Sequence, residues 1–452
     1  MKTLYLMRHG QTLFNVLKLD QGASDAPLTN LGVAQAHAAG THLAQIGIHP
    51  DHVFASPYER TCDTAELVTA HLTADGSPLP YERIAGLREF NFGTYEGKDS
   101  YLNPALPFGD KFVPFGGDAQ RDVTDRMVAT LTELMSRPDV KVALAVSHGA
   151  SCANFLRACQ DWSPVKYHPG IKNCSVFKFE FDEKDLAPQD LSASARRFAC
   201  VDLFEPDVPA ESVPDAGRIA MGLMRGAGDV AAAQPAATAA YPSAPTVGPK
   251  RLWLVRHAET LFNAQHKVQG WCDSPVTERG LEQARITGRM LADLGANPDH
   301  ALCSTAYRTA VTLDQILATM GRDDLSYLHL KGLREVGFGL FEAHDQCLQP
   351  QNDHGDTAQD HYYEAYQGED RSKVAARMYA SLRTLMDRPD VHEALVVSHG
   401  GSLSTFFKQC PQVVRKTQLT AFTNCMTYRY TYQDGIFTCE EVLIPDFSQL
   451  DA

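Results

Sequence analysis

The stretch LYLMRHGQT at residues 4–12 decides the fold, and LWLVRHAET at residues 252–260 repeats it. Each stretch opens with four apolar residues and then reaches an Arg-His pair. A short run that is apolar at every position is typical of a strand buried on both faces of a parallel sheet. We therefore predict two such sheets, each with an arginine and a histidine at the carboxyl end of one strand.

A second pair of apolar runs, VALAVSHG and ALVVSHG, ends on His148 and His399. In open α/β sheets, ligands bind beyond the carboxyl ends of the strands. Because both runs end on a histidine, we predict that the two histidines of each half share one rim of its sheet. His9 would lie with His148, and His257 with His399.

The two halves of the chain carry the same residues in the same order. His9 and Arg60 recur 248 positions later, Glu89 recurs after 246 and His148 after 251. The pair Asn173-Cys174 also recurs after 251 positions. Solenoid repeats recur every ~20–50 residues. A period this long instead indicates a duplicated domain of about 200 residues.

We predict an α/β fold with two tandem three-layer α/β/α domains at residues 1–205 and 250–452. Each would contain a mostly parallel sheet flanked by helices. Alternating segments near the end of each half, such as VFKFEF and TYRYTY, predict an antiparallel edge. Residues 206–249 are rich in Ala, Pro and Gly and predict an unstructured linker, in which residues 218–224 are the one candidate for a short docked helix.

Composition excludes several classes of protein. The net charge of −14 argues against nucleic-acid binding and against an anionic membrane surface. No apolar run approaches the ~20 residues of a transmembrane helix, and no signal peptide is visible at the N-terminus. The 11 cysteines contain no CxxC pair, which indicates reduced thiols and no zinc site. We expect a cytoplasmic protein without a metal.

The residues of the first half suit phosphoryl transfer. His9 is the candidate nucleophile, because a neutral imidazole forms covalent intermediates at pH 7. Arg8 and Arg60 would bind the phosphate oxygens through planar, bidentate contacts. His148 would donate a further hydrogen bond to these oxygens. Glu89 would protonate the leaving group and then take a proton from water, if its surroundings favour a protonated carboxyl group.

The second half carries the same catalytic set at Arg256, His257, Arg308, Glu335 and His399. Each residue alone is a weak signal, since a lone Arg-His pair is usually structural and a single Glu is usually solvated. The match of five residues in order, in two halves, makes chance an inadequate explanation.

Both halves resemble the histidine phosphatase superfamily, also called the phosphoglycerate mutase-like family. The matching motifs are RHGQT and RHAET, a Gln-Gly pair followed by DAPLT or DSPVT, and EFNFG and EVGFG. The resemblance implies a phosphohistidine on His9 or His257, with no metal and no organic cofactor. It also implies that a set of substrate-binding residues lines the pocket: Asn15, Gln21, Gly22, Asn263, Gln269 and Gly270.

Two residues of the second half depart from the pattern. Ala258 replaces the glycine that follows the nucleophile, and Ala343 replaces the glycine found as Gly97 in the first half. Both are small, so we expect activity to survive in the second half.

The resemblance leaves three functions to weigh. Mutases of this family carry a long insertion before the second histidine, but here the gaps from Glu89 to His148 and from Glu335 to His399 are only 59 and 64 positions. A more open pocket favours hydrolysis, so we predict a phosphomonoesterase active in both halves. The alternatives are a phosphoglycerate mutase, or one half that mainly binds phosphorylated ligands or holds a dimer together.

The expected partner is a small phosphorylated metabolite. Residues 98–120 and 344–370, expected to roof the two pockets, differ strongly in sequence, so we predict different substrates for the two sites. Pairing of the two domains within one chain and a homo-oligomer are both compatible with the duplication.

Overall fold

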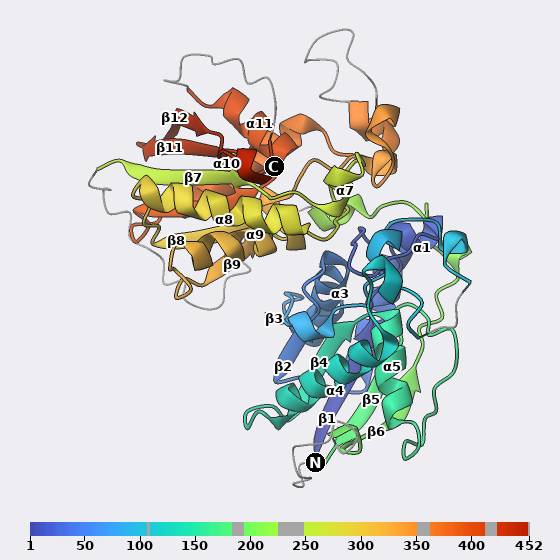
Figure 1. Cartoon of the computed structure of the whole chain (residues 1–452). Coiled ribbons are helices and arrows are strands. Elements are labelled where there is room, and N and C mark those ends of the chain that lie inside the picture. Colours follow the sequence, from blue (N-terminus) through green and yellow to red (C-terminus); the bar gives the residue numbers. More distant parts are fainter. Residues whose placement is uncertain (106–108, 183–193, 225–247, 350–361, 412–422, 451–452) are drawn as a thin grey trace. The chain divides into compact units, whose positions relative to one another are not determined.

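The computed structural model of the chain describes residues 1–105, 109–182, 194–224, 248–349, 362–411 and 423–450. The chain divides into two compact units, Met1–Ala220 and Met221–Ala452. Figure 1 shows that each unit has its own sheet with helices packed against it.

The sheet of the first unit has six strands in the order β3-β2-β4-β1-β5-β6. Strands β1, β2, β3 and β4 are parallel, and β5 and β6 add an antiparallel edge next to β1. This confirms the predicted mostly parallel sheet with an antiparallel edge. The strands are β1 (Lys2–Arg8), β2 (His52–Ala55), β3 (Glu82–Arg83), β4 (Val142–Ser147), β5 (Val176–Phe181) and β6 (Phe198–Phe204).

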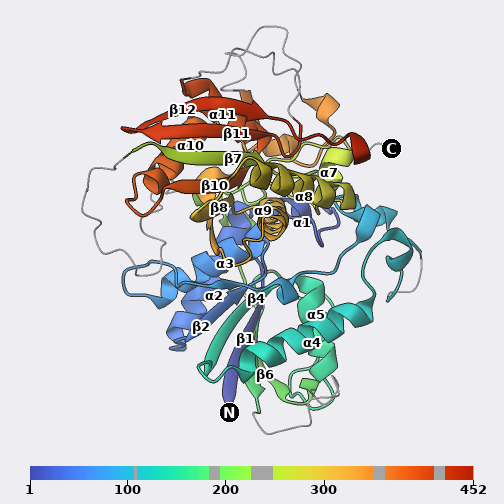
Figure 2. The ribbon, with the colours of Figure 1, turned by 60° about the vertical axis from the view of Figure 1, so that its left-hand side comes forward.

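Helices cover both faces of this sheet. Leu4 and Leu6 of β1 pack into the core on the side of α4 and α5, whereas Tyr5 and Met7 pack on the side of α2 and α3, and Figure 2 shows both helix pairs. The helices are α1 (Leu13–Leu17), α2 (Asn30–Gln45), α3 (Glu59–Thr69), α4 (Gln120–Ser136) and α5 (Gly149–Cys159). Short 3-10 helices lie at Ala70–Leu72, Ala85–Leu87, Gly93–Tyr95, Ser100–Leu102, Val113–Phe115 and Ala210–Ser212.

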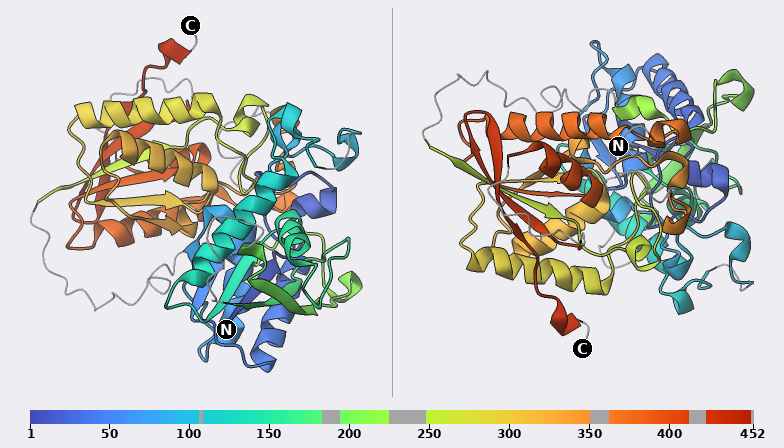
Figure 3. Two further views of the ribbon diagram at one scale, coloured as in Figure 1. Left: turned by 60° about the horizontal axis from the view of Figure 1, so that its bottom comes forward. Right: turned by 90° about the horizontal axis from the view of Figure 1, so that it is seen from above.

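The second unit repeats this architecture, with strand order β12-β11-β7-β10-β8-β9. Its strands are β7 (Lys250–Arg256), β8 (His300–Ser304), β9 (Tyr327–Leu330), β10 (Glu393–Ser398), β11 (Thr427–Gln433) and β12 (Ile436–Leu443). Its helices are α7 (Leu261–Ala264), α8 (Glu278–Asp293), α9 (Tyr307–Thr319), α10 (Arg371–Met386) and α11 (Gly400–Gln409). Its 3-10 helices are Met221–Met224, Lys331–Leu333, Gly339–Phe341, Gln346–Leu348, Tyr362–Tyr366 and Ser448–Leu450. The right panel of Figure 3 shows α8 (yellow) and α10 (orange) on opposite faces of the sheet.

The first part of the expected linker is docked on the first unit. The backbone N–H of Asn30 donates to Arg218, and the N–H of Ala220 donates to Leu28, each at 2.9 Å. Ile219 and Ala220 are buried, with exposed fractions of 4% and 5%. These contacts fall in residues 218–224, the one stretch of the expected linker that the sequence offered as a candidate for docking. Residues 225–247 of the expected linker lie outside the described residues.

Candidate active sites

The register of two parallel strands brings the histidines of each half together. Arg8 of β1 is the pairing partner of Ser147 of β4, so the next residues, His9 and His148, leave neighbouring strands at the same rim. Their ring centroids lie 5.3 Å apart. The second unit repeats this geometry, with its two histidine rings also 5.3 Å apart. The structure thus places the histidines on one rim, as the sequence indicated.

The backbone determines the tautomer of the first histidine. His9 Nδ1 lies 2.7 Å from the carbonyl oxygen of Gly10, and His257 Nδ1 lies 2.8 Å from that of Ala258. A carbonyl oxygen only accepts hydrogen bonds, so Nδ1 must carry the proton. The lone pair of the neutral ring is then on Nε2.

The surroundings keep this ring neutral. Burial lowers the pKa of His9 well below its usual value, and the positive charges of Arg60 and Arg8 lower the pKa further. In the second unit, burial followed by Arg308 and Arg256 lowers the pKa of His257 in the same way. Each ring therefore retains its Nε2 lone pair at neutral pH.

Most donors of Arg60 are already used within the protein. Its Nη1 donates to Ser24 O and Asp25 Oδ1, its Nη2 to Gly22 O, and its Nε to His148 Nδ1, at 2.8–3.0 Å. A guanidinium group has five N–H donors, so four are engaged. We expected a bidentate contact with phosphate, but such a contact would require one of these bonds to break.

Arg308 makes the matching contacts in the second unit. It donates to Cys272 O, Asp273 Oδ1, Gly270 O and His399 Nδ1 at 2.7–3.0 Å. The buried ion pairs Arg60–Asp25 and Arg308–Asp273 hold the loop that follows each Gln-Gly pair. Each arginine therefore keeps its charge and one remaining N–H for a group that binds at the rim.

The second histidine of each half is fixed by its arginine. Because Arg60 Nε can only donate, His148 Nδ1 must accept, and the ring proton lies on Nε2, 2.7 Å from Ser56 Oγ. Both ring nitrogens of His148 are therefore engaged. His399 differs, since its Nε2 is buried without a hydrogen-bond partner among the described residues. Burial lowers the pKa of both rings well below the usual value.

The glutamate lies at the N-terminus of the helix that follows the second histidine. Both Glu89 oxygens accept backbone hydrogen bonds, from Phe90, Ala150 and Ser151, at 2.8–2.9 Å. The hydroxyl of Ser151 donates a fourth bond at 3.0 Å. Glu335 has the same four contacts, with Val336, Gly401 and Ser402.

The Gln-Gly pair of each half packs against the residue that follows the glutamate, Phe90 or Val336. Thr12 Oγ1 donates to Gln21 Oε1 at 2.6 Å, which leaves Gln21 Nε2 buried without a hydrogen-bond partner among the described residues. A Cβ atom on Gly22 would lie 1.9 Å from the carbonyl oxygen of Phe90, so only glycine fits. In the second unit, Gln269 Nε2 instead donates to Asp273 Oδ1 at 3.1 Å.

Buried donors without partners indicate where a ligand would bind. Arg8 Nε in the first unit has no partner among the described residues, nor does Arg308 Nε in the second. A buried donor left unsatisfied costs about 1–3 kcal/mol. Each unit has a second such buried group, Gln21 Nε2 in the first and His399 Nε2 in the second.

Several residues that shape the sites were not predicted from the sequence to be functional. Glu96 accepts backbone hydrogen bonds from Gly22, Ala23, Ser24 and Phe92, and thereby holds the Gln-Gly loop. Others hold the arginines, the glutamate and the first histidine of each half. In the first half these residues are Asp25, Glu96, Arg126 and Asn173, and in the second they are Asp273, Glu342, Arg377 and Asn424. Their recurrence at the domain period is the signal that could have identified them.

Ala258 and Ala343, which replace glycines of the family pattern, keep the backbone conformation found at Gly10 and Gly97. The N–H of Ala258 donates to Thr312 Oγ1 at 3.0 Å, as that of Gly10 donates to Thr64 Oγ1 at 3.1 Å. Ala343 adopts a left-handed backbone with φ of +64°, close to the +67° of Gly97. The second site therefore keeps its geometry at the cost of one strained residue.

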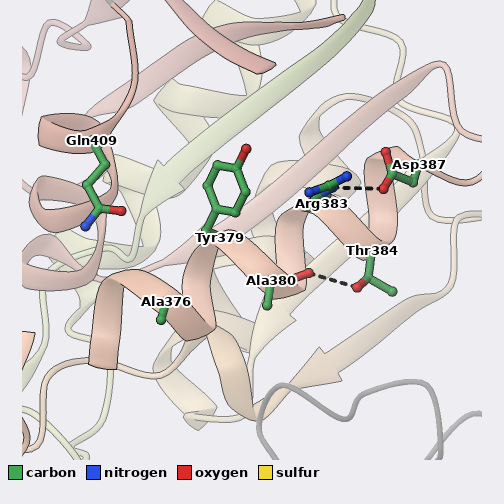
Figure 4. A pocket seen from close by; sticks show the side chains of 7 residues that line it. All are labelled: Ala376, Tyr379, Ala380, Arg383, Thr384, Asp387 and Gln409. Carbon is green, nitrogen blue, oxygen red and sulfur yellow. Dashed lines mark hydrogen bonds and ion pairs between the residues drawn. The ribbon is translucent and has the colours of Figure 1, made fainter. Parts of the chain in front are cut away.

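One further cavity lies away from both sites. It measures about 630 Å³ and is lined by residues of α10, by Asp387 that caps this helix, and by Gln409 of α11. In Figure 4, Arg383 and Asp387 form an ion pair at its edge. None of its lining residues belongs to the sets described above.

The described part of the chain contains no group of three or more His, Cys, Asp or Glu side chains that could hold a metal ion. None of its helices is long and apolar enough to cross a membrane.

The chain is similar to several known proteins. One is the probable phosphoglycerate mutase GpmB of Proteus mirabilis (strain HI4320), with 29% identity over 191 residues, or 40% of this chain and 86% of that protein. The corresponding protein of Yersinia pestis (strain Pestoides F) is 30% identical over 194 residues, with the same two coverages.

Solved structures resemble single halves of the chain. A phosphoglycerate mutase from Bacillus anthracis str. Sterne has 24% identity and a TM-score of 0.39, and covers 46% of this chain and 97% of its own. The mycobacterial glucosyl-3-phosphoglycerate phosphatase Rv2419c in complex with VO3 has 27% identity and a TM-score of 0.33, and covers 40% and 92%.

The family model of the histidine phosphatase superfamily (branch 1) matches residues 4–193 and again residues 252–444. Most of the chain is covered, and the two matches coincide with the two halves. The chain therefore belongs to the histidine phosphatase superfamily, as a tandem of two family domains.

Proposed function

We propose that each half hydrolyses phosphomonoesters through a phosphohistidine intermediate, with His9 and His257 as nucleophiles. One observation carries the proposal. The contacts from Nδ1 to the carbonyl oxygens of Gly10 and Ala258 direct a lone pair of each neutral ring to Nε2, beside two arginines. A neutral imidazole fixed in this tautomer, within a positive field, is suited to attack phosphorus.

In the first step, His9 Nε2 attacks phosphorus, and the bond between phosphorus and the ester oxygen breaks. The leaving oxygen takes a proton from Glu89, so a neutral alcohol departs and the phosphoryl group remains on Nε2. Arg8 and Arg60 offset the charge on the phosphoryl oxygens. The bond from Nδ1 to Gly10 O supports the positive charge that develops on the imidazole ring.

In the second step, water attacks phosphorus and the bond to Nε2 breaks. Glu89 takes a proton from the water, so phosphate is released, and the neutral histidine and the protonated acid are both regenerated. The hydrogen bonds from Ala150 and Ser151 hold the Glu89 carboxyl group beside the start of α5 throughout. Glu335, Gly401 and Ser402 correspond in the second half.

Hydrolysis is favoured by the short gaps between each glutamate and the second histidine, which leave little chain to exclude water. The names of the GpmB relatives support phosphoglycerate mutase activity as a second candidate. We infer a small phosphorylated metabolite as the substrate in either case.

The test uses the full chain and three variants: His9→Ala, His257→Ala and the double variant. With 4-nitrophenyl phosphate, each single variant should lose the part of the activity that its own site contributes. The hydrolytic activity of the double variant should fall by at least about 1,000-fold, because both nucleophiles are absent. A double variant with full activity would refute the assignment of the nucleophiles.

The single variants also separate the alternatives. Isomerisation of 3-phosphoglycerate, with and without bisphosphoglycerate, measures mutase activity in each site. If one single variant abolishes all turnover, the remaining half is a binding or dimerisation module. A panel of phosphorylated metabolites assayed with each single variant gives two substrate rankings, which we expect to differ. Identical rankings would contradict two specificities.

A further inference from the structure

The repeated Asn-Cys pair has no role in the chemistry described so far. Asn173 and Asn424 lie in tight turns that lead into β5 and β11. Each side chain reaches back to the nucleophile of its own half. Asn173 Nδ2 donates to the backbone carbonyl of His9, and Asn424 Nδ2 donates to that of His257, both at 3.1 Å.

The same amide nitrogen contacts a second asparagine. Asn173 Nδ2 lies 3.2 Å from Asn15 Oδ1, and Asn424 Nδ2 lies 3.2 Å from Asn263 Oδ1. Asn15 Oδ1 also accepts from the backbone N–H of Thr12 at 3.2 Å. Both groups that face this atom of Asn15 are donors, so the atom must be the oxygen.

This chain of contacts fixes the direction of the Asn15 amide. The carbonyl of His9 only accepts, which fixes the orientation of Asn173, and Asn173 in turn fixes the orientation of Asn15. The Nδ2 group of Asn15, with its two N–H donors, must then point away from Thr12 and Asn173. Donors aimed at phosphoryl oxygens stabilise the transition state best when they need no reorganisation.

The backbone of the turn reinforces the contact. Cys174 and Cys425 have left-handed φ angles of 58° and 59°, which are unfavourable for residues other than glycine. This conformation directs the N–H of Cys174 to the carbonyl of His9 at 3.2 Å, and that of Cys425 to the carbonyl of His257 at 3.4 Å. Strain of this kind persists where the surrounding structure requires it. Both halves retain it at the nucleophile.

We propose that Asn173 and Asn424, each oriented by its bond to the carbonyl oxygen of the nucleophile, are positioning residues that turn the amide donors of Asn15 and Asn263 toward the phosphoryl group. The proposal rests on the proposed function and assigns a role to residues that do not touch the substrate. It requires that Asn173 acts through Asn15. The two residues must therefore be energetically coupled.

The test isolates the first site in the full chain with His257→Ala. In this background we compare Asn173→Asp, Asn15→Ala and the two changes together. The carboxylate of Asn173→Asp would face two acceptors, so the Asn15 amide should turn over and present its oxygen to the substrate. We expect kcat/KM to fall about 100-fold in each single variant, as for loss of one oxyanion donor.

The double variant decides whether Asn173 acts through Asn15. If it does, Asn173→Asp adds less than about 3-fold to the loss caused by Asn15→Ala. If the fold losses in kcat/KM of the two single variants multiply in the double variant, the proposal is overturned, because Asn173 then acts independently of Asn15. An unchanged kcat/KM in Asn173→Asp would overturn it as well. Asn424→Asp and Asn263→Ala in the His9→Ala background provide a second, independent cycle.

Orthovanadate binding, measured by calorimetry on the same proteins, does not depend on turnover. Its affinity should fall in parallel with kcat/KM and show the same coupling. If the His257→Ala protein binds vanadate with this coupling but hydrolyses nothing, the proposed function fails and the positioning role stands. If it hydrolyses substrate but Asn173→Asp leaves vanadate affinity unchanged, only the positioning role fails.

Discussion

Gly97 and Ala343 occupy the same turn of the two sites with the same left-handed backbone, at φ of +67° and +64°. A side chain in this conformation costs roughly 1–2 kcal/mol, partly offset by the lower entropy of alanine in the unfolded chain. We expect Ala343→Gly to stabilise the second unit by about 1 kcal/mol in denaturant unfolding. Gly97→Ala is the matched control and should destabilise the first unit by a similar amount. If both changes alter the free energy of unfolding with the same sign, the backbone strain at Ala343 is not the cause.

The buried histidines make the stability of the protein depend on pH. Burial lowers the pKa of His9, His148, His257 and His399 in the folded state. The unfolded state therefore binds protons first as the pH falls. Stability should be unaffected above pH ~7 and should fall below pH ~6.5, by up to about 1.4 kcal/mol per histidine and pH unit.

Guanidinium unfolding at pH 7.5, 6.5 and 5.5 measures this dependence. His148→Gln should reduce the slope for the first unit and leave that of the second unit unchanged. A free energy of unfolding that stays constant between pH 7 and 5.5 would show that these rings are protonated in the folded protein.

One core tyrosine of the second unit has a buried hydroxyl group that makes no hydrogen bond among the described residues. Tyr428 lies at the place of Phe177 and is fully buried, and its hydroxyl has no hydrogen-bond partner among the described residues. Tyr428→Phe should therefore stabilise the second unit by about 1 kcal/mol. Tyr432→Phe is the control and should destabilise it, because the Tyr432 hydroxyl donates to Asp387. A loss of stability in both variants would contradict the prediction.

Arg126 should position the acid of the first site without touching the substrate. Its guanidinium donates to the carbonyl oxygens of Gly86, Arg88 and Glu89 at 2.7–3.2 Å. In the His257→Ala background, Arg126→Met should slow the hydrolysis of glycerol phosphate about 10- to 100-fold, because this leaving group needs a proton. Hydrolysis of 2,4-dinitrophenyl phosphate should change much less.

Arg121 of the same helix provides the matched control, because its side chain is 88% exposed. Arg121→Met should leave both rates unchanged. Equal losses on the two substrates in Arg126→Met would indicate a general disturbance of the site, and would exclude a specific effect on proton transfer.

The sequence predicted the features that follow from strand order and from repetition. Apolar runs that end on His9 and His148 predict two strands with a common rim, because parallel strands present their carboxyl ends at one edge of a sheet. The register of β1 with β4 confirms this placement. The sequence marked residues 218–224 as a candidate docked segment, but the partners of this segment could not be predicted, because they are backbone groups of Leu28 and Asn30 near the start of α2.

By itself, the sequence determined the duplication, the fold of each half and the residues that meet at each rim, since these depend on the order of residues along the chain. Only the tertiary structure decided the tautomer, the hydrogen bonds and the orientation of these side chains. It fixed the Nε2 lone pair of His9, committed four donors of Arg60 to the protein, and turned the amide of Asn15. The physical reason is that the direction of a hydrogen bond depends on partners such as Asn173, which are distant in sequence and become neighbours only on folding.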